Sequence, residues 1–285
     1  MEIGELFTRQ WAIEDGSTDR ELTAQVRAGA ISRVARGVYR LGPGFGPDPE
    51  AVVKSLKVRL SHESAAAWYG ASLITAPDRL HVTATRCRGR WADELPGVRF
   101  HRGQLDPSEV RVVRGIPITS PIRTGLDVAR SLPLEHSVAA LDSLARRGVI
   151  TPAAMQCAAA ALPNGPGRRA AVTAASLIDP LAESVFESMG RVRIVTAGLP
   201  APESQVTIND RDGMWIARVD FAWRAYRLVL ECDGYEFHGT REAFERDRRR
   251  WTALIRAGWR VVVVTWRQLM DEPDYLVDVL SDLLV

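Results

Sequence analysis

The last third of the chain carries the pattern that most restricts its fold. Apolar runs at 217–223 and 227–232 flank a short polar break, and a third run at 260–265 follows an amphipathic stretch of helical periodicity at 240–257. The short break favours an antiparallel hairpin, whereas the helical crossover favours parallel pairing of the second and third runs. This third is therefore expected to be an α/β domain with a mixed sheet.

Three carboxylates interrupt these apolar strands. Side chains alternate between the two faces of a strand, so Glu231 and Asp233 share one face. If the hairpin turns at 224–225, Asp220 lies opposite Val229 and diagonal to Glu231 on the same face. Such oxygen ligands suit Mg²⁺ or Mn²⁺, and a bound ion provides both a Lewis acid and a nucleophilic water for phosphodiester hydrolysis. The alternative is that the three acids are solvated residues of an exposed sheet edge.

Two glutamates precede the sheet in a helix expected at 179–197. Glu183 and Glu187 are one helical turn apart and are expected to point the same way. Either can add a metal ligand or orient a metal-bound water. Their spacing does not show which of the two does so, and both can equally be surface residues.

The first fifty residues begin with two predicted helices. The first is expected at 7–14, and Thr18 followed by Glu21 has the spacing of a capping box that opens the second at 19–28. Gly29 is expected to end it.

Two short strand-like runs at 31–41 come next, with a tight turn expected at Arg36-Gly37. Helix, helix and hairpin in this order predict a winged helix that binds double-stranded DNA. The expected DNA-binding residues are Arg27, Arg33, Arg36 and Arg40. The alternative is a small scaffold that binds protein.

Turn-forming segments at 42–49 and 163–167 mark expected boundaries on either side of a mixed α+β middle region. The domains expected are residues 1–48, 49–165 and 170–285. His62, His81 and His101 lie in the middle region without metal-ligand spacing, so each is expected to be a structural or surface residue.

Composition limits the other classes of protein. A net charge of +2 does not by itself imply a nucleic-acid partner, so that argument depends on where the arginines lie. The three cysteines have no paired spacing, which fits neither a disulfide framework nor a zinc site. Without a run of membrane-spanning length or a leader pattern, we expect a cytoplasmic protein with no membrane association.

The string RVDFAWRAYRLVLECDGYEFHGTREAFERDRRRWTALIRAGWRVVVVTWRQL resembles a bacterial family related to the very-short-patch repair endonuclease, within the PD-(D/E)XK nuclease superfamily. The resemblance covers 177–284 and implies a restriction-endonuclease-like fold. It implies that Asp220 and Glu231 are metal ligands, with Asp233 and His238 beside them. The segment SVFESMGR resembles the family's first helix and favours Glu187 as a further catalytic carboxylate, although Val185 stands where proline is usual. Gln205 matches a commonly polar position.

One position departs from the superfamily pattern. The usual Glu-x-Lys is here Glu231-Cys232-Asp233, and no lysine follows Lys57. That lysine would orient the attacking water and stabilise developing negative charge. His238, or a second metal held by Asp233, can substitute for it; equally, the site can be inactive.

The front of the chain resembles another family. The segments LFTRQWAIEDGSTDRELTAQVRAGAISRVARGVYRLGP, SHESAAAWYGA and GIPITSPIRTGLDVAR are similar to AbiEi-type antitoxins, which implies a winged helix that binds operator DNA and represses a toxin gene.

These observations lead to two functional hypotheses. The first is a DNA-binding protein with a Mg²⁺- or Mn²⁺-dependent endonuclease domain. The alternative is a transcriptional regulator or antitoxin whose nuclease-like domain is inactive and binds a toxin or another protein partner.

Overall fold

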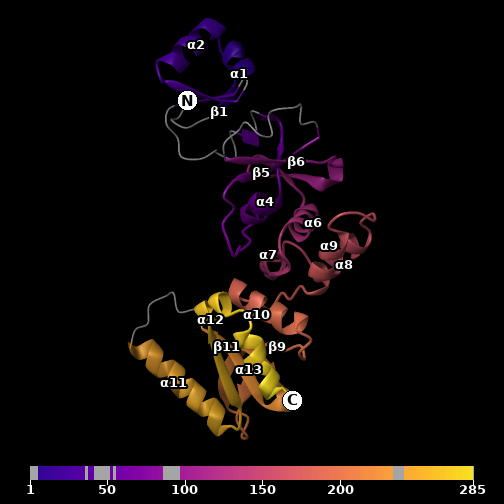
Figure 1. Ribbon diagram of the computed structural model, residues 1–285, viewed down its shortest axis with the longest axis vertical. Helices are drawn as coiled ribbons and strands as arrows, with labels where there is room; N and C mark the ends of the chain where they lie inside the picture. The colour runs from indigo at the N-terminus through magenta and orange to yellow at the C-terminus, as the bar shows by residue number, and fades with distance from the viewer. Residues whose placement is uncertain are drawn as a thin grey trace. The chain divides into compact units, whose positions relative to one another are not determined.

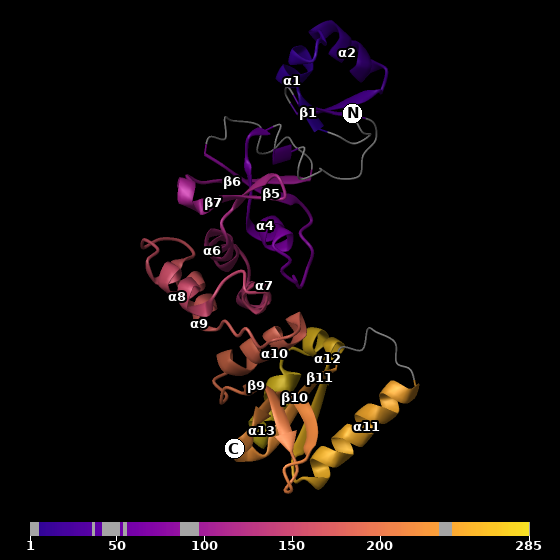
Figure 2. The same ribbon diagram turned by 180° about the vertical axis from the view of Figure 1, so that it is seen from behind.

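A computed structural model describes residues 6–35, 38–41, 52–53, 56–85, 97–233 and 241–284. The chain has a mixed α/β architecture (Figures 1 and 2) and divides into two compact units. The first comprises residues 1–70 and 75–131, and the second comprises 71–74 and 132–285. None of the helices in the described part of the chain has the length and apolar character that a membrane crossing requires.

The first unit begins with a small antiparallel sheet and two helices. The sheet has the order β1-β3-β2. The elements are β1 (Leu6–Thr8), α1 (Arg9–Glu14), α2 (Asp19–Arg27), β2 (Ile31–Ala35) and β3 (Val38–Leu41). The capping box predicted at Thr18 and Glu21 is present at the start of α2. The first helix begins at Arg9 rather than residue 7, because Phe7 pairs with Tyr39 in the sheet and is buried with Leu22 and Ile31. The turn expected at Arg36-Gly37 lies outside the described residues.

A second sheet of the first unit contains both parallel and antiparallel pairs in the order β6-β5-β4-β8-β7. Its strands are β4 (Arg59–Leu60), β5 (Leu80–Ala84), β6 (Val98–Arg102), β7 (Val110–Val113) and β8 (Ile116–Thr119). Helices α4 (His62–Trp68) and α6 (Pro121–Ser131) pack against each other, and α4 also contacts β5. Leu60, Val82 and Ile118 belong to the buried core formed by this sheet.

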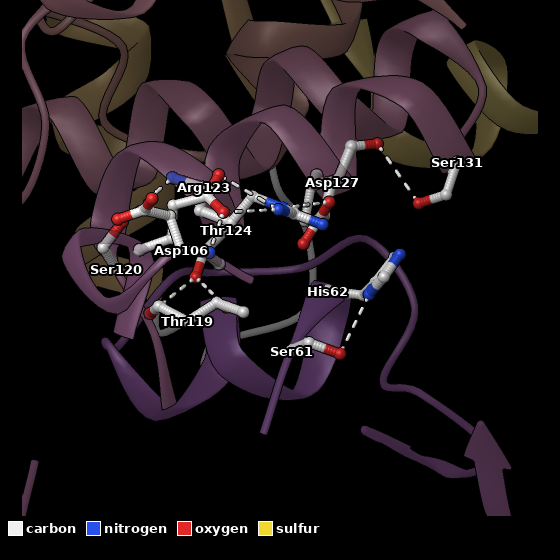
Figure 3. A network of polar contacts seen from close by, with 11 residues as sticks. Ser61, His62, Asp106, Thr119, Ser120, Arg123, Thr124, Asp127 and Ser131 are labelled. Atoms are coloured by element: carbon white, nitrogen blue, oxygen red, sulfur yellow. Dashed lines mark hydrogen bonds and ion pairs between the residues drawn. The ribbon is translucent and has the colours of Figure 1, made fainter. Parts of the chain in front are cut away.

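A polar network fixes the start of α6 (Figure 3). Arg123 donates to Asp127 Oδ1 at 2.9 Å and to both carboxylate oxygens of Glu109 at 3.0 Å. The hydroxyl groups of Thr119 and Thr124 form a hydrogen bond of 2.7 Å. Since β8 ends at Thr119, these contacts anchor α6 directly to the sheet.

The second unit combines helices before, within and after a four-stranded sheet of order β12-β11-β10-β9. The helices before the sheet are α7 (Leu134–Arg146), α8 (Pro152–Ala160), α9 (Arg168–Ser176) and α10 (Val185–Thr196). The remaining elements are β9 (Glu203–Asn209), β10 (Trp215–Trp223), β11 (Leu228–Asp233), α11 (Arg241–Arg256), β12 (Arg260–Thr265), α12 (Trp266–Asp271) and α13 (Tyr275–Leu283). Antiparallel β9–β10 and β10–β11 pairs and a parallel β11–β12 pair confirm the predicted mixed sheet.

Helices cover both faces of this sheet. On one face, Phe186 of α10 and Leu280 of α13 share a buried core with Phe221 of β10. On the other, α11 runs along the sheet (Figure 1), and its Leu254 packs with Val229 of β11. Both β10 and β11 therefore carry buried apolar side chains on each face of the sheet.

The helix expected at 179–197 begins later, at Val185. The hydroxyl of Ser184 caps the helix by accepting the backbone N–H of Glu187 at 3.1 Å. Asp179 instead accepts hydrogen bonds from the backbone of Leu181 and the hydroxyl of Ser204, which ties the preceding segment to β9.

Residues 163–167, expected to mark a domain boundary, connect α8 to α9. Helix α9 was not predicted from the sequence. Apart from residues 71–74, which belong to the second unit, the boundary between the two compact units in the sequence falls between 131 and 132. The three-domain division stays a prediction.

Candidate functional site

The hairpin between β10 and β11 turns later than the sequence predicted. Arg224–Tyr226 form a 3-10 turn and Arg227 adopts a left-handed conformation with φ 47°. Ala222 therefore pairs with Val229, where Asp220 was expected. Continued by two residues, this register places Asp220 directly across from Glu231 rather than diagonal to it.

Where these two residues face each other on the hairpin, Glu231 is buried and Asp220 is half-buried. Glu231 is 5% exposed. Asp220 Oδ2 accepts the backbone N–H of Cys232 at 2.8 Å, so the aspartate side chain bonds to the neighbouring strand. Asp233 is exposed at the end of β11. His238 lies outside the described residues.

A third carboxylate reaches this position from α10. Glu187 is 5% exposed and accepts from the backbone of Glu183 at 3.0 Å and from the Ser184 hydroxyl at 2.8 Å. Glu183 itself precedes the helix and forms a partly exposed ion pair with Arg218. The two glutamates thus have different surroundings, and Glu187 is the one beside the sheet.

Gln205 bridges the helix and the hairpin. Its Nε2 donates to Glu187 Oε2 at 2.8 Å and lies 3.4 Å from Asp220 Oδ1. The Gln205 backbone has φ 53°, a conformation that costs a residue with a side chain about 1–3 kcal/mol and recurs at functional sites. Gln205 thus places its side-chain amide between the carboxylates of Glu187 and Asp220. Glu187, Gln205, Asp220 and Glu231 are called the acid cluster below.

The acid cluster favours protonation because its carboxylates are withdrawn from water. Burial raises the pKa of Glu231 to about 7, while Arg250 opposes the rise and Asp220 adds to it. Burial likewise raises the pKa of Asp220 and of Glu187. A cation placed among these oxygens would stabilise the ionised forms.

The described residues of the cluster do not by themselves form a complete site for a divalent ion. Among the described residues, no group of three or more His, Cys, Asp or Glu side chains is arranged to hold a metal. Mg²⁺, however, commonly takes one or two carboxylates and keeps several waters. Glu231 Oε1 is buried without a hydrogen-bond partner among the described residues, but it forms an ion pair with Arg250, whose Nη2 lies 3.4 Å away.

The arginines expected to bind DNA lie in the first unit. Arg27 ends α2 and Arg33 lies on β2, both with exposed side chains. Arg40 pairs with Leu6 and Ser32 on β3, and its side chain is outside the described part. Arg36 is also outside it.

Three histidines that are distant in the sequence come together in the first unit. The rings of His62 and His101 stack with centroids 3.4 Å apart, and His101 Nε2 lies 3.3 Å from His81 Nδ1. His81 Nδ1 is also 2.8 Å from Glu63 Oε2. Each was expected to be a structural or surface residue; their spacing does not indicate this grouping, because it does not reveal the pairing of β5 with β6. Burial lowers the pKa of His62 to about 3 and that of His101 to about 4.

Other features of the acid cluster were missed in the sequence. Arg250 of α11 lies beside Glu231, with Nη2 3.4 Å from Glu231 Oε1. Arg250 was one of several arginines on that helix, and no local signal separated it from its neighbours. The strained backbone of Gln205 likewise has no sequence signature.

Comparison with known proteins matches residues 58–179 to the AbiEi antitoxin C-terminal domain. This segment begins just before β4 and ends after α9, so it contributes to both compact units. The crystal structure of the RV2827C protein from Mycobacterium tuberculosis is similar at 17% identity and a TM-score of 0.42, covering 71% of this chain and 79% of that one. A likeness at that level supports no conclusion about function.

Two full-length relatives come from Mycobacterium tuberculosis: Uncharacterized protein Rv2248 of strain H37Rv and Uncharacterized protein MT2308 of strain CDC 1551. Each is 31% identical over 267 residues, covering 91% of this chain and 94% of the relative. The chain therefore belongs to the family of these two proteins, and its residues 58–179 are similar to the AbiEi antitoxin C-terminal domain.

Proposed function

We propose that this protein is a DNA-binding transcriptional regulator of the antitoxin kind, which binds operator DNA and has a toxin as its protein partner. The observation that carries the proposal is the match of residues 58–179 to the AbiEi antitoxin C-terminal domain. In this proposal the nuclease-like third of the chain is a partner-binding module.

The elements before the matched segment support the DNA-binding part. Helices α1 and α2 are followed by the β2–β3 pair, which is the element order of a winged helix. Arg27 and Arg33 are exposed on this part of the chain, where phosphates of a duplex can reach them.

A gel-shift assay with the DNA upstream of the protein's own gene tests the proposal. We expect binding that weakens steeply with salt and is reduced by Arg33→Ala, because a phosphate contact is lost. Arg147→Ala is the matched control, since Arg147 is exposed after α7, outside the proposed DNA-binding part. Equal loss in both variants, or no binding by the wild type, contradicts the proposal. Co-purification with the product of an adjacent nucleotidyltransferase-like gene tests the toxin partner.

A second candidate function is a metal-dependent deoxyribonuclease of the PD-(D/E)XK type. The convergence of Glu187, Asp220 and Glu231 from a helix and two strands favours it. Asp220 and Glu231 would hold Mg²⁺ or Mn²⁺, which supplies a Lewis acid and an activated water. Gln205 orients Asp220, and Glu187 fixes Gln205. Asp233 and His238 would assist as an additional ligand and as a proton donor.

Plasmid nicking in the presence of Mg²⁺ or Mn²⁺ tests this second function. Asp220→Ala and Glu231→Ala are expected to abolish nicking. Glu183→Ala serves as the control because that glutamate pairs with Arg218 at the surface. Cleavage that survives both cluster substitutions assigns the activity elsewhere.

A further inference from the structure

A groove lies beside α1 and α2 in the first unit. It has a volume of about 630 Å³, and its described lining includes the apolar side chains of Phe7, Ala12, Leu22 and Ile31. Each of these four residues is at most 8% exposed, so together they form an apolar floor below the surface. Sites for small molecules typically have volumes of roughly 300–1,000 Å³. The groove therefore has the size of a small-molecule site.

The rim of the groove combines an aromatic ring with two carboxylates. Trp11, Glu14 and Asp15 all line the groove. Glu14 and Asp15 follow Trp11 by three and four residues, a spacing that places all three on one face of α1. Trp11 is 46% exposed, and within the described residues its ring has no aromatic or arginine neighbour. The indole face is therefore available to a ligand.

The charge at this rim has one sign. The described residues that line the groove include no lysine, arginine or histidine. Glu14 accepts a hydrogen bond from the neutral Gln10 Nε2 at 2.9 Å. Arg9, on the same helix, donates instead to Asp19, with Nε 2.6 Å from Oδ1. Two carboxylates beside an exposed indole ring favour a positively charged group, since a cation is also attracted to the face of tryptophan.

We propose that this groove is a binding site for an apolar organic cation of drug-like size. The apolar body of the ligand packs on the floor, and its ammonium group lies between the Trp11 ring and the carboxylates of Glu14 and Asp15. A ligand with an anionic group would place that charge beside two carboxylates, and a wholly polar ligand would lose its hydration against the apolar floor.

The groove and the expected DNA-binding residue of α2 lie on different faces of that helix. Leu22 and Gln25 line the groove, whereas Arg20 and Arg27 line a separate surface. Successive residues of a helix are rotated by about 100°, which places Leu22 opposite Arg20 and Arg27. A cation in the groove and a duplex at Arg27 therefore do not compete for the same side chains.

Isothermal titration calorimetry of the full chain at neutral pH tests the proposal with three probes that share an indole ring. Tryptamine is a cation, tryptophol is neutral and indole-3-propionate is an anion. We expect affinity to fall in that order, with tryptamine bound roughly 10-fold more tightly than indole-3-propionate, because cation–π attraction and the carboxylates act on the ammonium group alone.

Three variants locate the binding. Glu14→Gln keeps the shape of the side chain and removes its charge, so it should weaken tryptamine binding by roughly 2- to 5-fold and leave tryptophol binding unchanged. Trp11→Leu should weaken tryptamine binding by roughly 2- to 30-fold and reduce its advantage over tryptophol. Glu272→Gln is the matched control, since Glu272 is an exposed glutamate that follows α12 in the second unit.

Ala30→Leu provides an independent check, because Ala30 is exposed and lines the groove, so that a larger side chain occupies its space. Affinity for all three probes should fall in this variant, and circular dichroism checks that each variant is folded. The inference is overturned by equal or absent binding of the three probes to the wild type, by an equal loss in Glu272→Gln, or by unchanged affinity in Ala30→Leu. Loss of tryptamine binding at concentrations where sedimentation detects a dimer would assign the groove to a second copy of the chain and likewise overturn it.

Discussion

Asp220 of β10 accepts the backbone N–H of Cys232 in β11, with 2.8 Å between Oδ2 and the nitrogen. A side chain thus satisfies a backbone donor between two neighbouring strands. Asp220 is thus both a hydrogen-bond acceptor that stabilises the fold and a candidate ligand. Replacing it with alanine and replacing it with asparagine should therefore have different effects on stability.

Asp220→Ala removes the acceptor and leaves the Cys232 N–H without a partner, so it should cost about 1–3 kcal/mol of unfolding free energy. Asp220→Asn retains an oxygen acceptor and removes a charge whose burial is unfavourable. Without divalent ions at neutral pH, we expect the asparagine variant to be at least as stable as the wild type in urea unfolding. Equal destabilisation by both substitutions would contradict the proposed role of the hydrogen bond.

The acid cluster should make the protein less stable as pH rises when no divalent ion is present. Burial raises the pKa of Glu231 from 4.5 to about 7. Its contribution to stability is therefore complete below the unfolded-state pKa and is lost as pH rises through about 7. Urea unfolding in EDTA across that window checks this, and Glu231→Gln should flatten the decline. A profile unchanged in Glu231→Gln would show that other groups cause it.

The histidine cluster of the first unit should act in the opposite direction. The pKa of His62 is lowered from 6.5 to about 3 and that of His101 to about 4, chiefly by burial. Stability is then full above the unfolded-state pKa and falls as pH drops below it, because the unfolded chain binds protons that the folded chain does not. His101→Gln should reduce this acid sensitivity in urea titrations. His136→Gln is the control, since His136 lies on α7; equal effects of the two variants would exclude the cluster as the cause.

A buried ion pair joins α7 to α10. Arg191 Nη2 donates to Asp142 Oδ2 at 2.9 Å and to the carbonyl of Leu177 at 2.6 Å, and Asp142 is 1% exposed. Arg191→Met should cost about 3–5 kcal/mol, because the carboxylate is left without its counter-charge. Adding Asp142→Leu should restore part of that loss in a double-mutant cycle. Additive losses would show that the pair is not coupled.

The sequence predicted the sheet of the second unit where periodicity was the deciding signal. Alternation in β10 and β11 and the amphipathic α11 gave the elements, and the helical crossover gave the parallel β11–β12 pair. The hairpin register was not predicted correctly, because Arg224–Tyr226 form a 3-10 turn that is followed by Arg227 in a left-handed conformation. A glycine would have indicated such a conformation, but none is present at this position. Two residues of register changed the neighbour of Asp220 from Val229 to Glu231.

The members of the acid cluster were named from two kinds of signal. Alternation identified Asp220 and Glu231, and the family resemblance indicated Glu187 and Gln205. The approach of Arg250 was not predicted, because it depends on how α11 packs on the sheet. The histidine cluster was missed for a similar reason, since the pairing of β5 with β6 brings His81 and His101 together and His62 of α4 stacks on His101.

The packing of α7 on α10 determines how the chain can be divided. A fragment starting at residue 170 would separate Arg191 from Asp142 and Arg193 from Glu135, and would uncover the side of α10 that α7 covers. A fragment starting at 132 keeps all four partners. The helices that end the segment matched to the AbiEi antitoxin C-terminal domain thus cover part of the second unit, and a fragment that lacks them should be insoluble rather than a minimal domain.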